Sequence, residues 1–269
     1  MKIITPDAVS TRDGKELAEE DRFRFDCHPG VSCFNQCCRN LNLFLYPYDV
    51  LRLKNNLGLS AAAFIDRYVD VVMRAGNYFP DVLLSMSETP EKTCPFLTDA
   101  AGCVVYPDRS YSCRMFPVEQ GLRYDGTGAG GHMVAFFRPP DFCRGQDETR
   151  PLTVHEWIAD QDAGEYVRMT REWAQTKAMF TADPWGGEGP AGARGKMAFM
   201  AAYNMDAFRD FLFNSSFLTR FRVSADVLAR IKADETDLLL FGFEWIRHIV
   251  WAKPSPWLQP LSSDRKRSK

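Results

Sequence analysis

Apolar positions recur at helical spacing in two short segments after the first cysteines. In 47–58, a proline stands at the first position, apolar residues follow at helical intervals, and Gly58 closes the segment, which predicts a short helix with a glycine C-cap. In 60–73, Ser60 can cap a second helix whose apolar face carries residues such as Phe64 and Tyr68. Two helices are therefore expected to separate the early cysteines from the later ones.

Between residues 81 and 138 the pattern changes to short apolar runs divided by proline, glycine and aspartate. The runs are 82–86, 103–106, 118–124 and 132–137. Runs of this length and composition are typical of strands, so a small sheet or hairpin is predicted.

Beyond residue 153 the pattern is mainly helical. Thr153 and Glu156 form a capping box before a helical region that extends to residue 180. Ser224 and Asp234 can cap two later helices. The aromatic and methionine residues of 196–213 have helical spacing and are interpreted as core, with a ligand groove as the alternative. The predicted fold class is α+β, with a small β-rich element and a mainly helical C-terminal half.

Composition along the chain suggests three regions. Residues 1–22 are polar and acidic and predict an irregular arm, 23–160 hold the cysteines, and 161–269 form the helical region. Within the last, 183–195 contains five glycines and two prolines, which is typical of a surface loop or mobile linker.

Charge and hydropathy exclude some classes of protein. Lysine and arginine total 33 against 35 aspartates and glutamates, so a strongly basic nucleic-acid binder is disfavoured. No apolar run approaches the ~20 residues that a membrane-spanning helix needs, since Glu244, Arg247 and His248 interrupt the longest run. No secretory signal is visible, so the expected location is the cytoplasm.

The eight cysteines raise the question of metal binding or redox chemistry. All lie between Cys27 and Cys143. They are too dilute for a small disulfide scaffold, and a reducing compartment argues against structural disulfides. Metal binding is therefore the leading hypothesis.

The first four cysteines are Cys27, Cys33, Cys37 and Cys38. Their spacing does not fit a radical S-adenosylmethionine triad, haem attachment or a thioredoxin-type motif. If Cys33 and Cys37 share one helical turn, both sulfurs lie on the same face, within reach of one metal centre. Cys38 would then point about 100° away. It would serve a second ligand sphere, bridge two metals or pack in the core.

The later cysteines are Cys94, Cys103, Cys113 and Cys143. Eight thiols suffice for two four-coordinate sites, or for one site plus spectators. A buried cysteine can also be a small hydrophobe, an alternative that applies to Cys38 and Cys143.

Cationic residues accompany several thiols. Arg39, Arg114 and Arg144 each follow a cysteine directly, and Arg109 lies nearby. This arrangement suits low-pKa thiolates whose charge needs compensation. His28 adjoins the cluster and is interpreted as a solvated or structural histidine, with metal ligation as the alternative.

The segment from Phe25 to Ser60, then CPFL, then GCVVYPDRSYSCRMFP, resembles the YkgJ-type cysteine-cluster family, a zinc- or iron-chelating domain also found in flagellin lysine N-methylases. The resemblance covers about residues 23–160. It implies that the metal ligands are Cys27, Cys33, Cys37, Cys38, Cys94, Cys103, Cys113 and Cys143, and that the cofactor is an iron–sulfur cluster or zinc. The five residues between Cys27 and Cys33 exceed the spacing of the shortest family members.

The sequence is compatible with two functional classes. One is a metal-chelating module without turnover. The other is an S-adenosylmethionine-dependent protein lysine N-methyltransferase that acts on a protein substrate. The glycine-rich 125–131 superficially fits a cofactor loop, but flanking apolar runs favour a β-hairpin. Catalytic residues are not identified.

Overall fold

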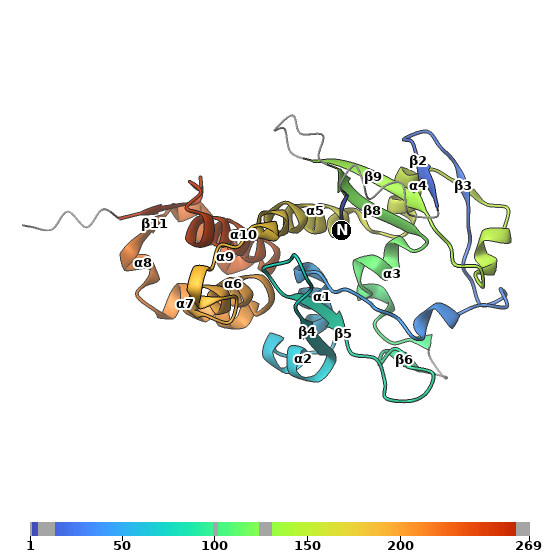
Figure 1. Ribbon diagram of the computed structural model, residues 1–269, viewed down its shortest axis with the longest axis horizontal. Helices are drawn as coiled ribbons and strands as arrows, with labels where there is room; N and C mark the ends of the chain where they lie inside the picture. The colour runs from blue at the N-terminus through green and yellow to red at the C-terminus, as the bar shows by residue number, and fades with distance from the viewer. Residues whose placement is uncertain (1, 5–13, 99–101, 124–130, 262–269) are drawn as a thin grey trace, which may run out of the picture.

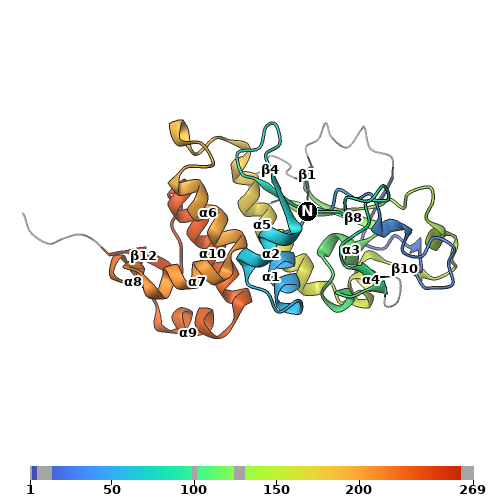
Figure 2. The same cartoon turned by 90° about the horizontal axis from the view of Figure 1, so that it is seen from below.

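A computed structural model of the chain describes residues 2–4, 14–98, 102–123 and 131–261. Figure 1 shows an elongated molecule with the largest sheet toward one end and a group of helices with a short strand pair toward the other. α1 (Pro47–Asn56) and α5 (Gly164–Ala178) lie between these ends. Figure 2 shows the same order from below. The fold is α+β, as predicted.

The largest sheet has four strands in the order β1-β8-β9-β2. β8 (Val118–Arg123) and β9 (His132–Phe137) pair antiparallel and confirm the expected sheet, while the glycine-rich 124–130 between them lies outside the described residues. β1 (Lys2–Ile4) runs parallel to β8, and β2 (Lys15–Leu17) runs antiparallel to β9. The arm predicted as irregular therefore contains two edge strands, which are too short to produce a recognisable alternating pattern.

Three smaller antiparallel pairs hold the loops of this half together. They are β3 (Phe23–Arg24) with β10 (Pro151–Leu152), β4 (Val69–Val72) with β5 (Asp81–Leu84), and β6 (Leu97–Thr98) with β7 (Gly102–Cys103). The predicted strand 103–106 is thus wrong beyond Cys103, because the chain turns into a 3-10 helix, Tyr106–Asp108, with Pro107 in its first turn.

The two predicted helices after the first cysteines are present, but the second is shorter than expected. α1 ends where predicted, and Gly58 follows with a positive φ of 63°. α2 (Ala61–Tyr68) is capped by Ser60, whose hydroxyl accepts the Ala63 N–H at 3.2 Å. The prediction of helix to residue 73 is wrong, because the valine-rich 69–72 pairs with β5 instead.

The C-terminal half is mainly helical. Its elements are α4 (Val154–Asp160), α5, α6 (Ala193–Tyr203), α7 (Met205–Asn214), α8 (Phe217–Arg220), α9 (Ala225–Ala233), α10 (Glu235–Trp251) and the pair β11 (Phe221–Val223) with β12 (Leu258–Pro260). The Thr153–Glu156 capping box is confirmed, as is the Asp234 cap of α10. Ser224 stands at the N-cap of α9 but makes no side-chain capping bond. Among the described helices, none is both long enough and apolar enough to span a bilayer.

One hydrophobic core runs through both halves, and the predicted core residues of 196–213 contribute to it through Phe208 and Leu212. The glycine-rich 183–195 is a loop with a short 3-10 turn, as expected, but it is anchored. Trp185 is 1% exposed, and its indole N–H donates to the Tyr78 carbonyl. The region boundary at residues 160–161 stays a prediction.

Candidate metal centre

Cys27, Cys33 and Cys143 form the first thiol group. The backbone nitrogen of Arg144 donates to the Sγ of Cys33 at 3.0 Å, which places Cys143 against Cys33. Cys27 lies close enough to both thiols for each to oppose its ionisation. Cys143 is thus brought together with two cysteines that lie more than a hundred residues earlier in the chain.

Gly145 allows this approach. The Asp26 N–H donates to the Gly145 carbonyl at 3.0 Å, and a Cβ at Gly145 would lie 2.5 Å from the Asp26 carbonyl oxygen. Any side chain at this position would push the loop of Cys27 away from that of Cys143. The glycine is therefore a structural requirement of the first thiol group.

Cys94, Cys103 and Cys113 form the second thiol group. The β6–β7 pair places Cys103 opposite Leu97, and the Leu97 N–H donates to the Cys94 carbonyl at 3.1 Å. Cys113 lies on α3 (Tyr111–Met115), where the Cys94 and Cys103 thiols oppose its ionisation. A hairpin and a helix thus supply this group.

The Cys37–Cys38 pair lies between the two thiol groups. Both residues belong to a 3-10 helix, Gln36–Cys38, and the Cys94 N–H donates to the Cys38 carbonyl at 2.8 Å. The Cys37 thiol influences the pKa of Cys27 in the first group and of Cys94 and Cys113 in the second. The pair is therefore placed to complete either group.

Cys33 and Cys37 do not share one helical turn, so the condition for placing both sulfurs on one helix face is not met. Asn35 has a φ of 63°, in the left-handed region, and so interrupts any right-handed helix between the two cysteines. Cys33 instead accepts the Arg144 N–H, while the Cys37 thiol affects the pKa of thiols in both groups. Asparagine tolerates this conformation better than most residues do.

Six of the thiols have a raised pKa as long as no metal cation acts on them. Burial is the first cause for five of them, and neighbouring thiols add to it at most positions. Burial raises the pKa to about 11 at Cys27 and to about 12 at Cys113. Burial also raises the pKa of Cys94, Cys103 and Cys143. At Cys37, contact with Cys38 is the first cause of the raised pKa. Crowded thiols of this kind need a cation before they can ionise together.

Only some of the four expected arginines act on the thiols. The charge of Arg39 opposes the rise in the pKa of Cys37, and Arg109 does the same for Cys103. Arg114 is buried elsewhere, with its guanidinium on the Gln161 and Pro107 carbonyls.

Arg144 and His28 also differ from a simple charge-compensating role. Arg144 contacts Cys33 through its backbone nitrogen, while its guanidinium pairs with Asp147 at 3.4 Å. His28 Nδ1 accepts the Gly30 N–H at 3.1 Å, and its Nε2 lies 3.9 Å from Glu148. These contacts favour the structural interpretation of His28.

Asp49 positions the helix that carries Cys113. Its carboxylate, fully buried, accepts the Tyr46 N–H at 2.9 Å at the start of α1 and the Tyr111 N–H at 2.7 Å at the start of α3. Burial raises the pKa of Asp49 to about 6, against the effect of these two bonds, so the group is an ionised acceptor at pH 7. One side chain thus joins the two helix starts.

Replacing Asp49 with alanine should destabilise the protein by roughly 2 kcal/mol or more, because two buried N–H groups lose their acceptor. Urea unfolding of the metal-loaded protein measures the effect. The matched control is Asp66→Ala, an exposed aspartate on α2, which should change stability by less than about 0.5 kcal/mol. Equal effects of the two variants would contradict the role of Asp49.

The segment that carries the thiol groups matches the model of a known sequence family. A family model described as "Putative zinc- or iron-chelating domain" covers residues 26–155, and all eight cysteines lie within that range. Residues 26–155 match the CxxCxxCC family model and are named here the CxxCxxCC domain. No curated protein and no solved structure matches the chain significantly.

The donor set of the CxxCxxCC domain suits a soft or borderline metal. Thiolates bind zinc and iron–sulfur clusters. Within the described residues, no three His, Cys, Asp or Glu side chains already converge closely enough to hold a metal ion.

Two supporting residues of the CxxCxxCC domain were not identified from the sequence. Gly145, in the run Cys-Arg-Gly, signals a close backbone approach. Asp49 stands three residues after Tyr46 at a helix start opened by a proline, which is the position of a carboxylate that caps the backbone. Both signals are local, but their partners come from distant segments.

Proposed function

We propose that the CxxCxxCC domain holds metal in two thiolate-rich centres. One centre would use the first thiol group and the other the second thiol group, and the Cys37–Cys38 pair would complete each set to four ligands. The observation that carries this proposal is the division of the eight cysteines into two groups of three with an adjacent pair between them. Four thiolates satisfy zinc or an iron–sulfur cluster.

An iron–sulfur cluster is favoured over zinc. A crowded all-thiol set with two adjacent cysteines suits a polynuclear cluster at least as well as a single ion. A cluster or zinc ion would supply cross-links between loops that have little regular structure, or a store of metal for transfer. Because all eight thiols would be ligands, no coordination position is left open for a substrate, which favours a binding module over an enzyme.

The metal content tests this proposal directly. After anaerobic purification, we expect about two metal centres per chain and visible absorption from iron–sulfur clusters. A colourless protein with zinc and no iron would favour zinc over an iron–sulfur cluster. A folded protein without metal in iron- and zinc-supplemented cells would refute both.

A methyltransferase is the alternative function. Calorimetry with S-adenosylmethionine on the metal-loaded chain separates the two: micromolar binding would favour the enzyme, and no heat would favour the chelating module. We also infer a cytoplasmic location, where a reducing environment would keep the eight cysteines available to a metal.

A further inference from the structure

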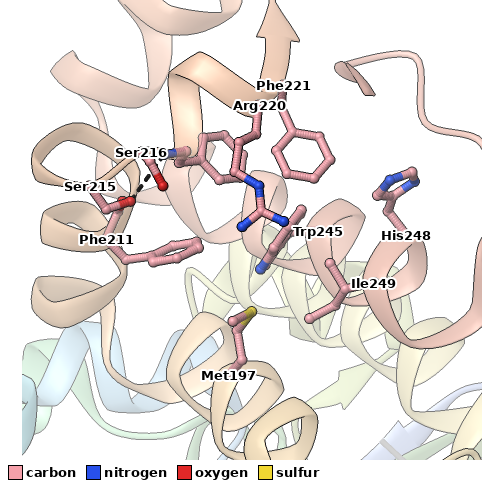
Figure 3. Close-up of a pocket in the computed structure, with 10 residues that line it drawn as sticks. Met197, Phe211, Ser215, Ser216, Arg220, Phe221, Trp245, His248 and Ile249 are labelled. Carbon is pink, nitrogen blue, oxygen red and sulfur yellow. Dashed lines mark hydrogen bonds between the residues drawn. The ribbon is translucent and has the colours of Figure 1, made fainter. Parts of the chain in front are cut away.

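A pocket of about 360 Å³ lies in the helical half, among α6, α7, α8, β11 and α10 (Figure 3). In Figures 1 and 2 these helices lie at the opposite end of the molecule from β3 and β6, so the pocket is separate from both thiol groups. Its volume is in the range of roughly 300–1,000 Å³ that is typical of small-molecule sites.

Aromatic side chains that pack against one another form the walls of the pocket. The Trp245 ring packs edge to face on Phe217 at 5.1 Å and on Phe221 at 5.0 Å, and it lies 6.0 Å from Phe211. Met197 lies across from them in Figure 3. Such mutually packed rings form a preorganised apolar surface.

Two hydrogen-bond donors in the pocket have no acceptor within the described residues. Arg220 is exposed, and its guanidinium makes no hydrogen bond, ion pair or ring contact with any residue that the structure describes. Trp245 is 3% exposed, and its indole nitrogen is buried without a partner. Figure 3 shows the guanidinium and the indole nitrogen pointing toward the same part of the pocket. A buried N–H without an acceptor is costly, and an oxygen of a ligand would relieve that cost.

The remaining polar groups argue for an anion. The Ser215 hydroxyl is already used, since it donates to the Phe211 carbonyl at 2.6 Å and accepts the Phe217 N–H at 3.1 Å. None of the ten residues that line the pocket is aspartate or glutamate. An aromatic cage for a methylated lysine would be incompatible with the positive charge of Arg220.

We propose that this pocket binds a small organic carboxylate with an aromatic body. The carboxylate accepts from the guanidinium of Arg220, with the Trp245 indole N–H as the second donor, and the apolar body packs against the aromatic walls. Arginine is suited to this role because its planar fork matches a carboxylate. The binding does not depend on the metal centres.

The probe is 3-phenylpropionate, titrated calorimetrically into the full metal-loaded chain, with uncharged 3-phenylpropionamide as the matched control. The acid should bind at least about tenfold more tightly than the amide, because only the acid offers a charged acceptor. One of the six tryptophan indole N–H resonances should also move when the acid is added. Equal affinities for acid and amide, or no binding of the acid at millimolar concentration, would overturn the proposal.

Arg220→Met should weaken acid binding by about tenfold or more and leave amide binding unchanged. The variant is expected to fold, since the side chain it removes is exposed. Arg222→Met is the matched control, because Arg222 is also exposed on the neighbouring β11 but does not line the pocket. The same loss of affinity in both variants would assign the effect to general charge and refute the role of Arg220.

Discussion

Cys37→Ser is expected to remove one of the two proposed metal centres, because each centre takes one ligand from the Cys37–Cys38 pair. Cys37 neighbours Cys27 in the first thiol group and both Cys94 and Cys113 in the second. A serine hydroxyl is a poor ligand for metals that select thiolates. Because the ligands converge only in the folded chain, metal loss should also loosen residues 27–143. Metal analysis per chain and hydrogen exchange measure the two effects.

Two controls make this test specific. Cys143→Ser should remove the centre of the first thiol group and leave the other, so it should retain about half of the metal. Ser32→Ala, an exposed residue in the same loop, should retain all of it. Complete metal removal from the unmodified chain should speed exchange in 27–143 more than in the helices after residue 195. Unchanged exchange in 27–143, or full metal content in Cys37→Ser, would contradict the proposed centres.

Gly242→Ala is expected to destabilise the helical half by about 3 kcal/mol, at the upper end of the range for overpacking. Gly242 lies on α10 where that helix crosses α6, and a Cβ there would lie 2.2 Å from the Ala201 carbonyl oxygen. Because this Cβ would clash with backbone atoms of α6, the helices α6 and α10 must themselves move apart. The melting temperature should fall by roughly 6 °C or more, which differential scanning calorimetry measures.

The matched control for this substitution is Gly164→Ala. Gly164 is the first residue of α5, and nothing lies within 4 Å of a Cβ built there. Alanine is a better helix former than glycine, so this variant should be neutral or more stable by up to about 1 kcal/mol. A Gly242→Ala protein that melts no lower than the unmodified chain would disprove the close contact of α6 and α10.

The helix starts could be predicted because their determinants are local. The caps by Ser60, Thr153 and Asp234 depend on residues within three positions, and all three are present. The helix predicted for 60–73 was too long because β4 forms only where β5 is available to pair with it. Strand formation at residues 69–72 therefore depended on a contact that the local pattern does not contain.

The pocket illustrates the same distinction in the helical half. The pattern of 196–213 indicated core and left a ligand groove as the alternative, and Met197 and Phe211 turn out to line a pocket. Arg220 and Trp245 reach it from other elements, so its donor chemistry could not be seen in that segment alone.

The sequence by itself determined the set of eight thiols, the family of the domain that carries them, the α+β class and most helix starts, because each depends on residue identity or on short spacing. Only the tertiary structure decided which thiols are neighbours. Cys33 meets Cys143 rather than sharing a turn with Cys37, because Asn35 reverses the local backbone and Gly145 allows two distant loops to touch. Spacing along a chain constrains contacts over one helical turn, whereas contacts across a hundred residues depend on how the whole core packs.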